Sequence, residues 1–109
     1  MALQEKKIEL IVDGVSGSEF IEKEMAELMR ELFETFKKKQ ACYGKGNIAK
    51  YGEIGCLVRA TDKIERLYNL VFLNRDNKIP EESVFDTWLD LADYALIAYL
   101  VKSGVWEKI

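Results

Sequence analysis

The sequence predicts an all-α fold, a small helical bundle of about three main helices preceded by a short N-terminal strand or arm. Apolar residues recur at three- and four-residue spacing in three long segments of the chain. Glycines, asparagines and the single proline gather between those segments, where turns are expected. A chain of 109 residues that is 49% hydrophobic fits one domain with a single core.

Residues 1–17 form the least regular part. Ile8, Leu10 and Val12 stand at alternate positions, which indicates a short strand, and Gly14 then interrupts the pattern. An arm that docks on a neighbouring subunit explains this composition equally well. We therefore separate an N-terminal arm or strand, residues 1–17, from a helical domain, residues 18–109.

The first predicted helix runs from Glu19 to Lys39, with Ser18 as its N-cap. Its apolar stripe consists of Phe20, Met25, Leu28, Met29, Leu32, Phe33 and Phe36. Residues 40–55 contain four glycines, which predicts a loop with at most a helical turn. Ordered loops of this length are more often functional than decorative.

The second predicted helix covers residues 56–73. Its spacing predicts a buried stripe of Leu57, Ala60, Ile64, Leu67, Tyr68 and Val71. The opposite side would carry Arg59, Asp62, Glu65, Arg66 and Asn69. Residues 74–80 are predicted to form a turn, with Pro80 near the start of the next helix.

The third predicted helix begins after Ser83, which forms a capping box with Asp86, and runs to about Lys102. Gly104 marks its end, and Trp106 is expected to pack back onto the bundle. Apolar side chains cover so much of this helix that we expect it to be mostly buried.

Composition excludes several kinds of site. The chain has no histidine, which rules out histidine-assisted triads and cysteine–histidine metal centres. A net charge of −3 without a basic stripe speaks against a nucleic-acid groove. No signal peptide or bilayer-spanning run is visible, so we expect a cytoplasmic protein with no membrane partner. Cys42 and Cys56 are expected to be reduced packing residues.

The third helix carries Asp86, Asp90 and Asp93 within one narrow arc. Carboxylates buried without a partner cost several kcal/mol, and a divalent cation removes that cost. An antiparallel second helix could add Asp62 and Glu65. Four carboxylates suit Mg²⁺ or Mn²⁺. The plainer interpretation is that Thr87, Asp90, Asp93 and Tyr94 are the solvated edge of an amphipathic helix, with surface salt bridges around them.

Basic and aromatic residues near these acids suit a nucleotide. Arg59, Lys63 and Arg66 could contact phosphate oxygens. From the glycine-rich segment, Tyr43, Lys45 and Asn47 are candidates for base or sugar contacts, although core or turn roles also explain them.

Two resemblances add to this reading. Asp62-x-x-Glu65 and Asp90-x-x-Asp93, separated by 24 residues, resemble the ExxE…ExxD signature of MazG-like all-α nucleoside triphosphate pyrophosphohydrolases, with Asp in place of Glu at 62 and 90. The segments YGKGNIAKYGEIGCLVRATDKIERL and NKIPEESVFDTWLDLADYALIAYL resemble the phage and bacterial nucleotide modification associated domain family, first type.

These resemblances imply an Mg²⁺-dependent (or Mn²⁺-dependent) nucleoside triphosphate pyrophosphohydrolase of phage nucleotide metabolism or modification, in the cytoplasm of a bacterial host. Asp62, Glu65, Asp90 and Asp93 would hold the metal and carry catalysis, and Asp86 would orient a ligand or water from outside. A homodimer or homotetramer is implied. The alternatives are a protein that binds or sequesters a nucleotide without turnover, and a helical interaction module.

Overall fold

The computed structural model describes residues 20–43, 46–79 and 82–107. Its elements are α2 (Phe20–Tyr43), α3 (Gly46–Leu67), the π-helical turn η1 (Tyr68–Phe72), α4 (Val84–Lys102) and the 3-10 turn η2 (Val105–Glu107). These ranges contain helices and no strand, which confirms the all-α prediction. The predicted strand in residues 1–17 and the Ser18 cap lie outside them.

The contacts divide the chain into two compact units, Met1–Cys42 and Tyr43–Ile109. In the first unit, α2 confirms the helix predicted for Glu19–Lys39 and continues to Tyr43. Lys37 closes an ion pair with Glu34 one turn earlier, with Nζ 3.1 Å from Oε1, and its ammonium lies 5.2 Å from the centre of the Phe33 ring.

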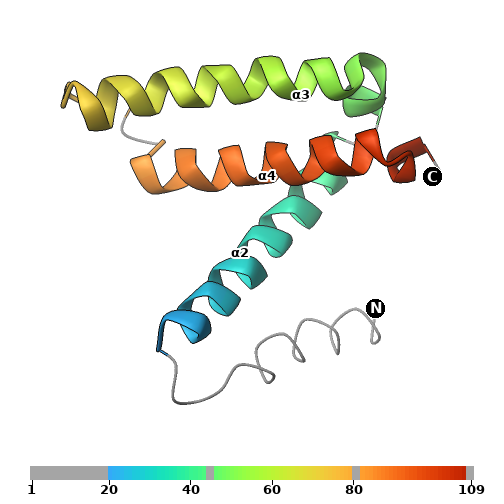
Figure 1. Ribbon diagram of the computed structural model, residues 1–109, viewed down its shortest axis with the longest axis horizontal. Helices are drawn as coiled ribbons and strands as arrows, with labels where there is room; N and C mark the ends of the chain where they lie inside the picture. The colour runs from blue at the N-terminus through green and yellow to red at the C-terminus, as the bar shows by residue number, and fades with distance from the viewer. Residues whose placement is uncertain (1–19, 44–45, 80–81, 108–109) are drawn as a thin grey trace. The chain divides into compact units, whose positions relative to one another are not determined.

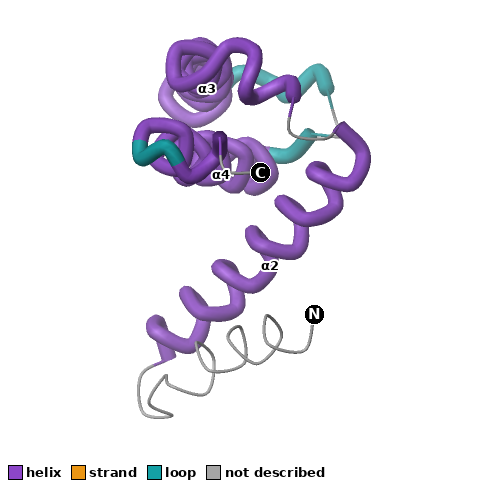
Figure 2. Tube along the Cα trace, turned by 90° about the vertical axis from the view of Figure 1, so that its right-hand side faces the viewer, coloured by secondary structure: helices purple, strands orange, loops and turns teal. Residues whose placement is uncertain are grey.

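In the second unit, α3 and α4 lie side by side and antiparallel (Figures 1 and 2). Lys102 of α4 lies near Glu53 at the beginning of α3, whereas Thr87 contacts Arg66 at its end. The antiparallel pair proposed from the sequence is therefore present.

The prediction of a loop over residues 40–55 is wrong for most of that range. α2 extends to Tyr43, and α3 already begins at Gly46. Only Gly52 leaves the helical conformation inside α3, with φ 62° and ψ −149°, a backbone geometry that L side chains rarely adopt. Gly46 and Gly55 are tolerated within helix, so counting glycines overestimated the loop.

The buried stripe predicted for the second helix is also wrong in its direction. Leu57, Ile64, Tyr68 and Val71 are exposed, and of the predicted set only Leu67 is fully buried. Among the described residues of this unit, the buried apolar ones are Cys56, Leu67, Ile97 and Trp106. α4 thus packs against the side of α3 that carries Cys56, Lys63 and Arg66. The two basic side chains find hydrogen-bond acceptors there, Glu82 for Lys63 and Thr87 for Arg66.

The predicted boundaries of α4 are confirmed. Ser83 Oγ accepts a hydrogen bond from the Asp86 amide at 3.0 Å, and Asp86 Oδ2 accepts one from the Ser83 amide at 3.2 Å, which closes the capping box. At the other end Gly104 has φ 82°, and Trp106 is buried as expected. The prediction that α4 is mostly buried is wrong, because Phe85, Trp88, Leu96 and Tyr99 are exposed.

Across the ranges that the structure describes, none of the helices has both the length and the apolar character needed to cross a bilayer.

Candidate functional site

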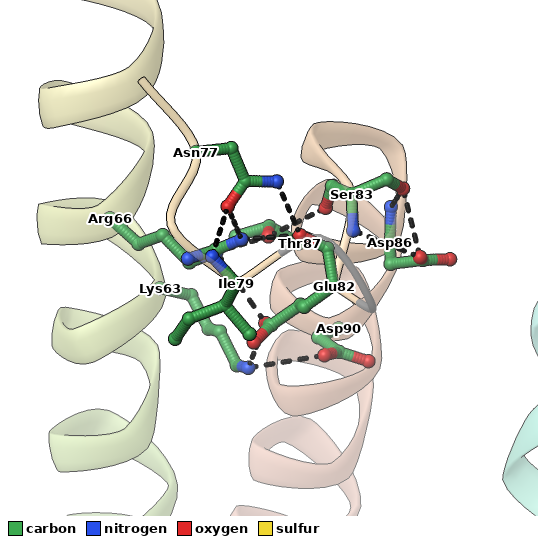
Figure 3. A network of polar contacts seen from close by, with 9 residues as sticks. All are labelled: Lys63, Arg66, Asn77, Ile79, Glu82, Ser83, Asp86, Thr87 and Asp90. Carbon is green, nitrogen blue, oxygen red and sulfur yellow. Dashed lines mark hydrogen bonds and ion pairs between the residues drawn. The ribbon is translucent and has the colours of Figure 1, made fainter. Parts of the chain in front are cut away.

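Lys63 joins α3 to α4 at one edge of a polar network between the two helices (Figure 3). Its Nζ donates to Glu82 Oε1 at 2.8 Å and pairs with Asp90 Oδ2 at 3.1 Å. Burial by itself would lower the pKa of Lys63, but the hydrogen bonds and negative charges of Glu82 and Asp90 outweigh it and raise that pKa above 10.5. The ammonium is therefore held charged by one carboxylate from the connecting segment and one from α4.

Arg66, one turn further along α3, joins three parts of the unit (Figure 3). Its Nε donates to Thr87 Oγ1 at 3.0 Å, and its Nη2 donates to Asn77 Oδ1 at 3.0 Å and to the Glu82 carbonyl oxygen. The guanidinium therefore ties the connection between the helices to the first turn of α4.

Thr87 is completely buried, and its Oγ1 hydroxyl donates a hydrogen bond to the Ser83 carbonyl oxygen at 2.9 Å. The sequence interpretation missed Asn77, Glu82 and Thr87 as members of this network. A usable signal was present, since Thr87 interrupts an apolar helix one turn after its cap and faces the same way as Asp90.

The plainer interpretation, a solvated helix edge, is wrong for two of its four residues. Thr87 is 0% and Asp93 only 6% exposed. Among the described residues, every buried side-chain nitrogen and oxygen atom has a hydrogen-bond partner, so these groups are satisfied inside the protein. Asp90 is half-buried and bound by Lys63.

The acids of α3 are placed differently from those of α4. Asp62 and Glu65 are both exposed. Since a helix turns about 100° per residue, the Lys63 side chain that points to α4 leaves Asp62 to one side and Glu65 almost opposite. Glu65 is contacted instead by Asn69, whose Nδ2 donates to the Glu65 carbonyl at 2.9 Å.

Residues 20–43, 46–79 and 82–107 contain no group of three or more acidic or cysteine side chains placed to hold a metal ion. The structure thus brings Asp90 and Asp93 onto the side facing α3, and it does not bring Asp62 and Glu65 to them. The arrangement of one chain does not fit a ready-made four-carboxylate centre. Asp86, the predicted outer residue, serves the capping box.

The glycine-rich segment supplies a second contact. The bend at Gly52 lets Asn47, with its amide oxygen turned toward Arg59, accept from Nη2 at 2.9 Å and from Nη1 at 3.3 Å. A candidate base or sugar residue and a candidate phosphate residue therefore meet on α3. The Tyr43 side chain and Lys45 lie outside the described part of the chain.

Both cysteines are free thiols. Burial, reinforced by the charge of Glu53 and opposed by that of Arg59, raises the pKa of Cys56, so this thiol stays protonated and unreactive. The packing role predicted for Cys56 is confirmed, whereas Cys42 is exposed.

Comparison of the chain with known protein families, with curated proteins and with solved structures found no match.

Proposed function

We propose that this chain is an Mg²⁺-dependent, nucleoside triphosphate pyrophosphohydrolase-like protein that acts in phage nucleotide metabolism or modification. The observation that supports it most is the 3.1 Å contact between Lys63 and Asp90. Lys63 lies within Asp62-x-x-Glu65 and Asp90 begins Asp90-x-x-Asp93, so the contact sets the two acidic motifs at the same level of adjacent antiparallel helices. The burial of Asp93 adds support, because carboxylates out of water gather at functional sites.

In this proposal the basic residues bind the phosphates and the carboxylates bind the metal. Lys63 and Arg66 would exchange carboxylate and amide acceptors for phosphate oxygens, which are acceptors of the same kind. Arg59, held by Asn47, would contact the nucleotide from the first half of α3. Asp62, Glu65, Asp90 and Asp93 remain the candidate ligands for Mg²⁺, whose contribution would be to neutralise charge on the polyphosphate.

A second candidate is a protein that binds or sequesters a nucleotide without hydrolysing it. The same ion pair favours this alternative, because an Asp90 carboxylate neutralised by Lys63 is a weaker metal ligand. The exposed positions of Asp62 and Glu65 favour it as well.

The test is a screen of the purified protein against each NTP and dNTP, with and without Mg²⁺, measuring nucleotide binding by calorimetry and pyrophosphate release by a coupled assay. The enzyme proposal expects metal-dependent pyrophosphate release for at least one nucleotide. The sequestering protein expects tight binding and an intact ligand.

Two matched variants make the result specific to the site. Asp90→Asn removes the charge that Lys63 contacts, and Asp76→Asn removes an exposed charge that pairs with Lys78 at 3.8 Å. We expect Asp90→Asn to abolish release, or to weaken binding at least tenfold, and Asp76→Asn to match the wild type. Neither binding nor release for any nucleotide would refute both candidates, and an active Asp90→Asn would remove Asp90 from the site.

A further inference from the structure

One carboxylate oxygen of Glu82 lies between two cations of α3. Its Oε1 accepts a hydrogen bond from Lys63 Nζ at 2.8 Å and lies 3.7 Å from Arg66 Nε (Figure 3). An ammonium and a guanidinium that share one anionic oxygen are also the arrangement that binds a phosphate oxygen. The Glu82 side chain therefore occupies the position at which an oxyanion would contact both residues.

The four charged groups of this contact balance one another. Lys63 and Arg66 carry two positive charges, and Glu82 and Asp90 carry two negative ones. Without the Glu82 carboxylate, one positive charge would be in excess. That charge attracts a polyphosphate and the carboxylate repels it, so phosphate binding and the Glu82 contact exclude each other.

The backbone of Glu82 is held independently of its side chain. Its carbonyl oxygen accepts from Arg66 Nη2 and from Asn77 Nδ2, the latter at 3.1 Å, and its amide donates to the Ile79 carbonyl oxygen at 3.1 Å. None of these bonds involves the carboxylate, so its departure from the cations requires only a change of side-chain rotamer. The side chain is 28% exposed and already contacts solvent.

The two carboxylates that contact Lys63 differ in freedom. Asp90 lies inside α4, where the preceding turn restricts its rotamers. Glu82 precedes the Ser83 cap, outside the helix, and its side chain has one more rotatable bond. Of the two, Glu82 is therefore the easier to displace.

We propose that the Glu82 carboxylate is an internal competitor for phosphate, which covers Lys63 and Arg66 in the unliganded protein and rotates away when a polyphosphate binds them. The inference rests on the proposed function in one respect, that Lys63 and Arg66 receive phosphate, and it involves neither metal binding nor hydrolysis. The apparent affinity for phosphate is then the intrinsic affinity multiplied by the fraction of molecules in which Glu82 has left the cations.

Calorimetry with inorganic triphosphate, without divalent metal and at constant ionic strength, tests the competition in the full chain. Glu82→Gln keeps the shape of the side chain and removes its charge. We expect it to bind triphosphate roughly tenfold more tightly than the wild type, and we expect the gain to disappear when Lys63→Gln is added. Glu82→Asp keeps the charge but withdraws it by one methylene, and is expected to bind more tightly by a smaller factor.

The matched control is Glu34→Gln, which removes the same charge from a 3.1 Å ion pair with Lys37 on α2. Its affinity for triphosphate is expected to equal that of the wild type. Circular dichroism verifies that each variant keeps its helices. If Glu82→Gln loses them, Glu82→Asp decides the comparison with the wild type.

The outcomes separate this inference from the proposed function. Equal triphosphate affinities for the wild type and Glu82→Gln, both weakened by Lys63→Gln, would overturn the inference and leave the phosphate role of Lys63 intact. A gain shared by Glu34→Gln, or one that survives Lys63→Gln, would also overturn it, because net charge or another site would be responsible. Binding by none of the proteins would refute the phosphate role of Lys63 and Arg66, and with it both proposals.

Discussion

The two long sides of α4 reverse the usual arrangement of polar and apolar residues. The side toward α3 carries Thr87, Asp90 and Asp93, which are buried or half-buried, whereas the outward side exposes Phe85 and Tyr99. Buried polar groups are informative because each needs a partner, and Lys63 and Arg66 provide such partners here. Exposed aromatic residues are informative because water is a poor environment for them. The first side thus carries a polar contact between α3 and α4, and the second is an apolar surface that the contact with α3 leaves uncovered.

Removing Arg66 should have the largest effect on the polar side. Arg66→Met keeps a long apolar stem and deletes the guanidinium, which donates to Thr87 Oγ1, Asn77 Oδ1 and the Glu82 carbonyl oxygen. We expect a loss of about 3 kcal/mol in the free energy of unfolding, since acceptors that were charge-assisted lose their partner in a half-buried place. Urea denaturation followed by circular dichroism measures it.

The control for Arg66 is Lys78→Met, which removes a cation that is 84% exposed and pairs with Asp76 at 3.8 Å. Its stability should equal that of the wild type. Equal stability for Arg66→Met and Lys78→Met would mean that the hydrogen bonds of Arg66 contribute nothing measurable to stability. They would then not explain why this side of α3 packs against α4.

Ser83→Ala separates the stability of the α4 helix itself from its packing on α3. The substitution removes the hydroxyl that accepts from the Asp86 amide at 3.0 Å, and should cost about 1 kcal/mol in the free energy of unfolding. Ser103→Ala, beyond the other end of α4, removes a single bond to the Leu100 carbonyl and should cost less. Thermal unfolding of the three proteins compares them, and a larger loss for Ser103→Ala would contradict the capping box.

The smallest expected effect is the pH dependence that Lys63 introduces. Its pKa is raised in the folded state, so its contribution to stability is fully present below about 10.5, the unfolded value, and is lost as pH rises through the folded pKa. An arginine at this position, in Lys63→Arg, stays charged across the whole range from pH 8 to pH 11.5 and therefore serves as the reference.

Urea denaturation of both proteins from pH 8 to pH 11.5 tests it, because the other titrating groups are common to both and cancel. The stability of the wild type relative to Lys63→Arg should stay constant up to about pH 10.5 and then fall. A constant difference up to pH 11.5 would show that the ammonium is not held by Glu82 and Asp90.

Local signals in the sequence predicted much of the fold correctly. The three helices, the capping box at Ser83 and the end at Gly104 depend on residues within a few positions of each other. The loop predicted over residues 40–55 failed because Gly46 and Gly55 lie in helix and only Gly52 has a backbone geometry that needs glycine. Two members of the candidate site, Lys63 and Asp90, were chosen from the sequence and do meet.

By itself, the sequence determined where α4 begins and ends, because the Ser83 cap and the Gly104 conformation act over one turn. It did not determine the end of α2 at Tyr43 or the beginning of α3 at Gly46. Only the tertiary structure decided which side of α3 and of α4 is covered. Apolar spacing predicted Leu57 and Ile64 toward the core, yet Lys63 and Arg66 face α4, since Glu82, Asn77 and Thr87 satisfy them there. That choice depends on groups 11 to 21 residues away, which no local pattern contains.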